Sequence, residues 1–331
     1  MMVAGWAAAA LLSFSIAWLW RLWALRRGVL DVPGQRSSHV TPTPRGGGVG
    51  LWLSMLAALL VAQPLGQANA GVVVGLALAG LIGFIDDLRP LSPALKLGGQ
   101  ALAAVPLALA LPVLLPQGWP AAVGPLLAAA LALFLMNAWN FMDGIDGIAA
   151  LCVLSVAAVA LLADDGGLAP WLGAAALGFL PLNAPRARLF MGDCGSHALG
   201  FAVAVLLLDA QRSPGEGPDD AGSAAFPLLA ACAPFVVDVL GTLVQRARDG
   251  ERLASAHRRH LYQRLVQCGY SHARVSAGYA GAMLAAGGAV YGIDKTLGGG
   301  FAAMLAVYGL TAAGWWWLGR HVAAPPEASG R

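Results

Sequence analysis

The sequence predicts an all-α, polytopic integral membrane protein of about 11 transmembrane helices, with the N-terminus outside and the C-terminus inside. Apolar residues make up 58% of the 331 residues and charged residues only 11%, whereas a soluble domain carries roughly 25% charged residues. The charges also avoid long stretches of the chain, as they do in proteins that cross a bilayer. This composition excludes a disordered chain, and the weak, scattered net charge of +3 excludes a nucleic-acid partner.

Each predicted span is an apolar run of about the length, near 20 residues, that a helix needs to cross hydrocarbon. The first run is followed rather than preceded by its positive charges, so we interpret it as a transmembrane helix and not as a signal peptide. The seventh run is the weakest, because Pro181 and Asn183 interrupt it. In chain order the runs cover residues 3–25, 46–66, 70–85, 98–116, 120–136, 145–163, 168–183, 194–210, 224–245, 273–292 and 298–318.

The distribution of Lys and Arg predicts the orientation. With the N-terminus outside, all of the 20 basic residues except Arg212 and Lys295 fall in cytoplasmic connections, at the cytoplasmic ends of the adjoining spans or in the C-terminal tail. The asymmetry also supports an odd number of spans, because one missed span would mix the two sides. We therefore predict a single transmembrane domain over residues 1–331 with a disordered tail at 320–331. Its cytoplasmic catalytic loops are predicted at residues 26–45, 86–97, 137–147, 184–196 and 246–272.

Four polar side chains interrupt the apolar sequence LMNAWNFMDGIDGIAA at residues 135–150. Asn137, Asn140, Asp143 and Asp146 recur at every third position, although amides and carboxylates are costly beside hydrocarbon. Each step of three residues drifts about 60° around a helix axis, because one turn takes 3.6 residues. The four residues cannot share one face of a straight helix. We expect the two Asn at the end of the fifth span and the two Asp at the turn into the sixth.

Further polar clusters fall on the same predicted cytoplasmic side. Asp86 and Asp87 end the third span, Asp193 precedes the eighth, and the arginine-rich stretch 246–264 joins the ninth and tenth. Singly, each is well explained as a solvated helix end, a turn or an arginine contact with anionic lipid. Together they fit that explanation poorly, because the orientation was obtained from Lys and Arg alone and yet brings the carboxylates to the same side.

Carboxylate and amide oxygens facing arginines are suited to phosphoryl transfer. Without a Cys/His cluster of zinc spacing, such oxygens favour Mg²⁺, with Mn²⁺ as the alternative ion. Arginines bind phosphate through forked donors, and catalysis of phosphoryl transfer is mostly positioning and charge neutralisation. A membrane site of this kind implies a soluble phosphorylated donor and a lipid acceptor.

The alternative is a transporter or flippase for a phosphorylated lipid or sugar, without chemistry. Transporters place ionisable groups near the bilayer midplane, often on broken helices in repeated halves. In this sequence the carboxylates cluster at predicted helix ends and no repeat is evident. The enzyme is therefore the favoured interpretation.

Five segments in chain order resemble the polyprenyl-phosphate N-acetylhexosamine-1-phosphate transferases. That superfamily, glycosyltransferase family 4, includes phospho-N-acetylmuramoyl-pentapeptide transferase and undecaprenyl-phosphate N-acetylglucosamine-1-phosphate transferase. Any one segment would be a weak match, but five in the family's order make a strong one. The segments are DVPGQRSSHVTPTPRGGGVG (31–50), GFIDDLRPLSPALKL (83–97), NAWNFMDGIDGIAA (137–150), RLFMGDCGSHALGF (188–201) and HRRHLYQRL (257–265).

The resemblance implies a reaction, its partners and a location. An N-acetylhexosamine-1-phosphate would pass from a UDP-N-acetylhexosamine to undecaprenyl phosphate, with release of UMP and with Mg²⁺ as cofactor. The enzyme would lie in the bacterial cytoplasmic (inner) membrane with its active site facing the cytoplasm. The identity of the sugar, the polyprenyl length and a homodimeric assembly are left open.

The resemblance also implies roles for individual residues. Phe190 would stack on uracil, which a flat ring suits, and Asp146 would hydrogen-bond the uracil edge. The metal ligands would be Asp193 and Asn140. The further substrate-binding residues would be Asn137, Arg258, Arg259 and Arg45. The catalytic residues would be Asp86, Asp87, Asp143, Lys96 and His260.

The last segment departs from the family pattern. Many relatives carry HLHHRL there, whereas this chain has HLYQRL, so that Tyr262 and Gln263 replace two histidines and His260 is kept. The departure resembles the branch that initiates O-antigen or similar surface polysaccharide, and it argues against the peptidoglycan enzyme. Asp238 matches a family carboxylate as well, and within a span it needs a buried partner.

Overall fold

The computed structural model describes residues 2–33, 41–163, 167–212, 224–252 and 257–322, which form an almost wholly helical chain. Short elements join the long helices: strands β1 (Leu30–Asp31) and β2 (Thr43–Pro44), the 3-10 turn η1 (Gly66–Ala68) and helix α10 (Leu261–Gln267). The long helices are α1 (Met2–Arg27), α2 (Gly48–Ala62), α3 (Asn69–Leu88), α4 (Pro93–Ala110), α5 (Val123–Met142), α6 (Ile148–Ala163), α7 (Ala169–Asn183), α8 (Gly192–Ala210), α9 (Ala225–Arg248), α11 (His272–Leu297) and α12 (Gly300–His321).

The prediction of an all-α polytopic membrane protein is confirmed. Within the described residues each of the eleven predicted spans coincides with one long helix, and seven of these helices are long and apolar enough to cross a membrane. Helices α2 and α6 are apolar but shorter. The largest difference at a helix start is in α4, which begins at Pro93 rather than at residue 98. There the Ser92 hydroxyl accepts a hydrogen bond from the Leu95 N–H at 3.3 Å and Pro93 opens the first turn, both strong starting signals for a helix.

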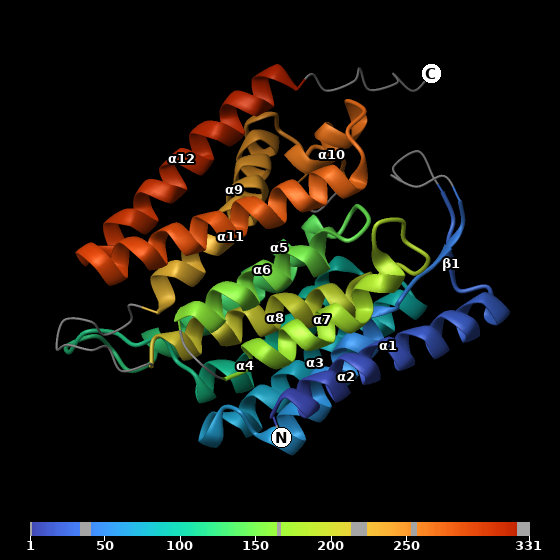
Figure 1. Cartoon of the computed structure of the whole chain (residues 1–331), viewed down its shortest axis with the longest axis horizontal. Coiled ribbons are helices and arrows are strands. Elements are labelled where there is room, and N and C mark those ends of the chain that lie inside the picture. Colours follow the sequence, from blue (N-terminus) through green and yellow to red (C-terminus); the bar gives the residue numbers. More distant parts are fainter. Residues whose placement is uncertain (1, 34–40, 164–166, 213–223, 253–256, 323–331) are drawn as a thin grey trace.

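The helices pack as one bundle with α8 at its centre. Helix α8 contacts α2, α3, α5, α6, α7 and α9, and nearly all of its residues are buried. Figure 1 shows α9, α11 and α12 along one side of the bundle and α1 to α4 along the other, with α5 to α8 between them. Because α8 is surrounded by other helices, the residues at its first turn are held from several directions.

Glycines bring the first turn of α8 against its neighbours. A Cβ at Gly83 of α3 would lie 2.3 Å from the backbone oxygen of Asp193, and one at Gly48 of α2 would lie 2.2 Å from the Cα of Gly195. Real side chains do not tolerate such distances, so glycine is required for this packing. Gly48 is thus part of a tight helix contact.

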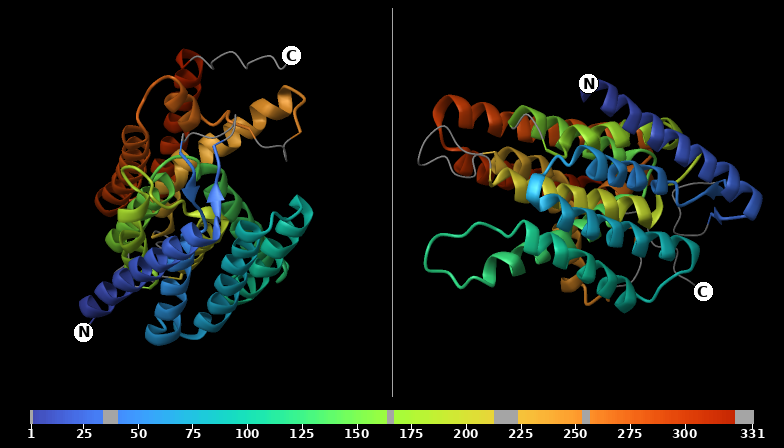
Figure 2. Two further views of the ribbon diagram at one scale, coloured as in Figure 1. Left: turned by 90° about the vertical axis from the view of Figure 1, so that its right-hand side faces the viewer. Right: turned by 90° about the horizontal axis from the view of Figure 1, so that it is seen from below.

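A two-stranded hairpin covers one end of the bundle. Strand β1 pairs antiparallel with β2, with Leu30 opposite Pro44 and Asp31 opposite Thr43. The Pro44 carbonyl accepts a hydrogen bond from the Phe190 N–H at 2.8 Å, and the Gly47 N–H donates to the Phe190 carbonyl at 2.9 Å. In Figure 2 (left), the view onto this end, the hairpin stands between α1 and the C-terminal helices. Both strands lie within residues 26–45, which were predicted from the sequence as a cytoplasmic loop.

Some predicted segments lie partly outside the described residues. The tail predicted at 320–331 begins within α12, where Arg320 and His321 are helical, and residues 323–331 are not described. The same holds for residues 34–40 and 253–256 of two predicted cytoplasmic loops.

Candidate active site

The polar stretch at residues 137–146 divides where the sequence predicts. Asn137 and Asn140 lie in the last turns of α5, which ends at Met142, and the two aspartates lie in the turn before α6. Gly147 has a φ of +76°, a conformation that glycine adopts at little cost. Its N–H donates a hydrogen bond to the Asn183 side-chain oxygen at 3.1 Å. The turn is therefore fastened to the end of α7.

Asp87 joins the end of α3 to the beginning of α8. Its two carboxylate oxygens accept hydrogen bonds from the backbone N–H groups of Asp193 and Cys194, each at 3.0 Å. A carboxylate at this place satisfies donors that have no partner within the helix and complements the helix dipole. A Cβ at Gly192 would lie 2.5 Å from Asp87 Oδ1, and Gly192 has a φ of +75°. Only glycine fits between the two helices there.

Asp193 is at the centre of a charged cluster. Its carboxylate accepts hydrogen bonds from Lys96 Nζ at 2.5 Å and from Asn140 Nδ2 at 2.9 Å. Lys96 Nζ also lies 2.9 Å from Asp86 Oδ2, and the Leu91 N–H donates to Asp86 Oδ1 at 2.8 Å. Four residues from three predicted loops are thus connected in one chain of polar contacts, from Asp86 through Lys96 and Asp193 to Asn140.

A buried polar chain supports this cluster from inside the bundle. Asn137 donates to Gln100 Oε1 at 2.8 Å, and Gln100 Nε2 lies 2.9 Å from His197 Nε2. His197 Nε2 lies 3.9 Å from Asp193 Oδ2. Gln100 and His197 are fully buried, where an unpaired polar group would be costly. Neither residue was predicted from the sequence to belong to the site, although His197 stands one helical turn after Asp193, a spacing that places both on one face.

A cleft of about 350 Å³ opens beside Asp193. Seven of the predicted site residues line it: Arg45, Asp87, Asn140, Asp143, Asp146, Phe190 and Asp193. Asp31 of the hairpin, Gln263 of α10 and His272 of α11 line it as well. His272 Nδ1 lies 3.2 Å from Asp146 Oδ2. The cleft is thus built from elements spread over most of the chain.

Six predicted site residues do not line the cleft. Lys96 lies beside the cleft because it contacts Asp193, and Asp86 in turn contacts Lys96. Asn137 donates a hydrogen bond to Gln100 inside the bundle.

The predicted arginines of the loop 246–272 lie elsewhere. Arg259 forms ion pairs with Asp249, at 2.6 Å, and with Glu251. Arg258 and His260 are also absent from the lining. From the predicted loop 246–272 it is Gln263 and His272 that line the cleft. Gln263 stands at one of the positions where the sequence departs from the family pattern.

His260 and Asp238 organise the start of α10. His260 is buried, and its Nδ1 lies 3.7 Å from Asp238 Oδ1. Asp238 accepts hydrogen bonds from the Leu261 N–H at 2.8 Å, from the Tyr279 hydroxyl at 2.7 Å and from Trp315 Nε1 at 3.0 Å. The buried carboxylate that the sequence left without a partner therefore has several donors around it.

Negative charge dominates the cleft. Its lining holds five aspartates, among the described residues, against Arg45 as the one Lys or Arg. Removal from water raises the pKa of the Asp143 carboxyl well above its usual range, and the nearby carboxylates of Asp193 and Asp87 raise it further. A concentration of carboxylates of this kind favours a bound cation.

The oxygen donors fit a magnesium ion that shares its ligands with a substrate. Within the described residues no three His, Cys, Asp or Glu side chains converge closely enough to hold a metal by themselves. Mg²⁺, however, usually takes only one or two protein carboxylates and completes its shell with water and phosphate oxygens. Asp193, with the Asn140 amide beside it, meets that requirement, and no sulfur or cluster of imidazoles competes.

Comparison with known proteins places these features in a family. The family described as "Glycosyl transferase family 4" matches residues 69–211. The decaprenyl-phosphate N-acetylglucosaminephosphotransferase of Mycolicibacterium smegmatis is 35% identical over 82% of this chain and 76% of its own length. A probable undecaprenyl-phosphate N-acetylglucosaminyl 1-phosphate transferase of Bacillus subtilis is 28% identical over 75% of this chain and 73% of its own. The phospho-N-acetylmuramoyl-pentapeptide-transferase of Deinococcus radiodurans is 35% identical over 49% of this chain and 60% of its own.

Proposed function

The chain belongs to glycosyl transferase family 4, the superfamily of polyprenyl-phosphate sugar-phosphate transferases, and from that premise we propose the specific reaction. An N-acetylhexosamine-1-phosphate passes from a UDP-sugar to undecaprenyl phosphate or a similar polyprenyl phosphate, and UMP is released. The names of the relatives from M. smegmatis and B. subtilis favour N-acetylglucosamine as the sugar. The product would begin an O-antigen or another surface polysaccharide.

The observation that carries this proposal is the meeting of Asp193, Asn140 and Lys96 at the edge of a carboxylate-lined cleft. A bound magnesium ion would neutralise charge on the diphosphate of the donor. Asp193 and Asn140 would hold it, and Lys96, which already bridges Asp193 and Asp86, would bind a phosphate oxygen. Together the three side chains would hold the donor phosphate at the edge of the cleft and stabilise the charge that develops on it in the transition state.

The nucleoside end of the donor would lie farther along the cleft. Phe190 is half-buried on the cleft wall and is fixed through its backbone to Pro44 and Gly47, so its ring is a rigid surface on which uracil can stack. Asp146, on the same lining, would accept hydrogen bonds from the uracil edge. Arg45 would neutralise part of the diphosphate charge through its forked donors.

Asp143 is the best placed group to exchange a proton with the acceptor phosphate, because its carboxyl lies on the cleft and its raised pKa favours holding a proton. It lines the cleft, and in the described part of the chain its carboxylate has no hydrogen-bond partner. Both oxygens of Asp87 accept backbone N–H groups instead, which supports a positioning role for that residue. The pairing of Asp86 with Lys96 supports the same for Asp86, and burial beside Asp238 supports it for His260.

We further propose that the cleft faces the cytoplasm of a bacterium from its inner membrane, with the N-terminus outside. The ends of α3 and α7 and the beginnings of α8 and α11, all beside the cleft, adjoin connections that carry arginine, and such connections stay on the cytoplasmic side. This orientation gives the cleft access to soluble UDP-sugars and leaves the lipid acceptor to approach from within the bilayer.

The test is a panel of UDP-N-acetylhexosamines incubated with the purified protein, Mg²⁺ and either undecaprenyl or decaprenyl phosphate. Mass spectrometry of the lipid product identifies the sugar, and release of UMP measures the rate. Binding of a UDP-sugar without any UMP release or lipid product would favour the transporter alternative and would contradict the proposed reaction.

A further inference from the structure

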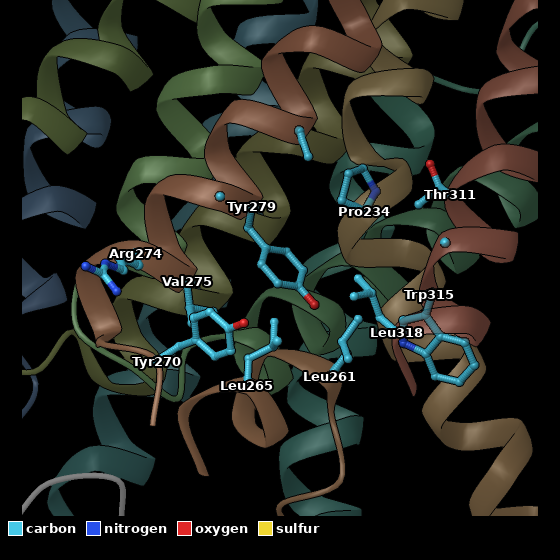
Figure 3. A pocket seen from close by; sticks show the side chains of 13 residues that line it. Pro234, Leu261, Leu265, Tyr270, Arg274, Val275, Tyr279, Thr311, Trp315 and Leu318 are labelled. Carbon is cyan, nitrogen blue, oxygen red and sulfur yellow. The ribbon is translucent and has the colours of Figure 1, made fainter. Parts of the chain in front are cut away.

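A second cavity, of about 560 Å³, lies outside the candidate active site between α9, α10, α11 and α12. Most of its lining is aliphatic or aromatic, including Pro234 of α9, Leu265 of α10 and Leu318 of α12. Figure 3 shows these side chains around an open space between the helices. We call this cavity the C-terminal groove.

Two glycines keep the C-terminal groove open. A Cβ added at Gly278 of α11 or at Gly314 of α12 would meet no atom within 4 Å, and both residues are exposed. A glycine inside a helix is less favourable than alanine, and in the described residues no close helix contact requires glycine at either place. Because α11 and α12 belong to a membrane-spanning bundle, the exposed side of the groove meets lipid.

The groove has a cationic end. Arg274, at the first turn of α11, and the exposed Tyr270 line it there. In Figure 3 the hydroxyl groups of Tyr270 and Tyr279 point toward its middle and Arg274 lies at its edge. Within the described residues the Arg274 side chain forms no ion pair. A guanidinium without a carboxylate partner beside an apolar channel is suited to an amphipathic molecule with a phosphate head.

We propose that the C-terminal groove binds one bilayer phospholipid with an anionic headgroup. Its phosphate lies on Arg274 and one acyl chain follows the groove past Gly278 and Gly314. A phospholipid satisfies both halves of the lining at once, since an acyl chain packs against the apolar wall and the arginine neutralises the phosphate of the head. The cytoplasmic leaflet, where the proposed orientation puts Arg274, is the leaflet rich in anionic lipids.

The bound lipid would also support the candidate active site. Tyr279 and Trp315 both line the groove and both donate hydrogen bonds to Asp238. Asp238 in turn holds the start of α10 through the Leu261 N–H. The Tyr262 hydroxyl of α10 donates to the Phe141 carbonyl at 2.9 Å, at the end of α5. Filling the groove therefore steadies the contact between α10 and the α5 end of the cleft.

The experiment measures lipid binding by the purified, delipidated full chain in detergent, so that it does not depend on the proposed reaction. Dioleoyl phosphatidylglycerol and dioleoyl phosphatidylcholine are titrated while the unfolding temperature is followed, and native mass spectrometry counts the retained lipids. We expect one retained phosphatidylglycerol and about tenfold tighter binding of it than of phosphatidylcholine. Arg274→Gln should remove that tenfold preference, which is the effect of losing one charge-assisted hydrogen bond.

Variants that fill the groove separate this site from general lipid effects. Gly278→Leu should abolish the stabilisation by either lipid, and Thr311→Leu, on the opposite wall, provides a second filling variant. Gly288→Leu is the matched control, because Gly288 lies in the same helix, has open space around it and does not line the groove. It should behave as the wild type does.

Three results would overturn the proposal. The first is equal binding of the two phospholipids by the wild-type chain. The second is full retention of phosphatidylglycerol by both filling variants while they remain folded. The third is displacement of phosphatidylglycerol from the wild type by undecaprenyl phosphate, with loss of undecaprenyl phosphate binding in Gly278→Leu, which would assign the groove to the acceptor chain.

Discussion

Replacement of Asp193 by Asn should separate activity from folding. The side chain of Asp193 meets Lys96 at 2.5 Å and Asn140 at 2.9 Å, and it is the proposed magnesium ligand. Asp193→Asn keeps the size of the side chain and its Oδ1 acceptor for the Asn140 amide, but it removes the negative charge. Transfer should therefore fail while the bundle stays folded.

The structure indicates how large each effect should be. Lys96 keeps Asp86 as a partner at 2.9 Å, and the bonds from the first turn of α8 to Asp87 come from backbone N–H groups, which the substitution leaves in place. The free energy of unfolding should fall by only about 1.5–3 kcal/mol, the contribution of one hydrogen bond to a charged group. Loss of metal stabilisation should raise the barrier by about 3–4 kcal/mol, or roughly 10²- to 10³-fold in rate.

The assay is UMP release by the purified variant, with unfolding temperature measured on the same sample. Asp209→Asn is the matched control, because Asp209 lies at the opposite end of α8 from Asp193, and it should retain normal turnover. Turnover of Asp193→Asn within a few-fold of the wild type at ordinary Mg²⁺ would refute the assignment. So would a variant that is inactive only because it is unfolded.

Four further predictions follow from the same geometry. Asn140→Ala should lower kcat, because it removes a proposed metal ligand. Asp146→Ala should mainly raise the KM for the UDP-sugar, because uracil lies away from the reacting phosphate. An unchanged KM for Asp146→Ala in steady-state kinetics would refute this division of roles. Activity should be lost in EDTA and restored by Mg²⁺ or Mn²⁺ but not by zinc, and full activity after exhaustive chelation would show that no metal is needed. The topology can be tested in a variant without the native cysteines. A cysteine introduced at position 118 should react with an impermeant reagent in intact cells, and one at position 251 only after permeabilisation. The reverse pattern would contradict the predicted orientation. Gly192→Ala should lower the free energy of unfolding by at least 1–2 kcal/mol, the approximate cost of a left-handed backbone for a residue with a Cβ, and an unchanged unfolding temperature would contradict the close approach of Asp87 to Gly192.

The sequence by itself determined the class of the protein and the positions of its long helices. Apolar runs of spanning length depend only on local composition, so each predicted span reappears as a helix, including the interrupted seventh run as α7. The polar segments were also visible locally, since carboxylates and amides next to apolar runs are conspicuous. The hairpin of β1 and β2 was missed because two-residue strands leave no periodic pattern in a sequence.

Tertiary structure alone decided what each polar residue does. Asp86 and Asp87 are neighbours of the same type, yet one pairs with Lys96 and the other holds the first turn of α8, 106 residues away. Asn140 reaches Asp193, whereas Asn137, one turn earlier, points to Gln100 inside the bundle. The physical reason is that each step along a helix turns the side chain by about 100°, so its partner depends on which distant helix packs against that face. A local pattern does not contain that information until the helices have packed around α8.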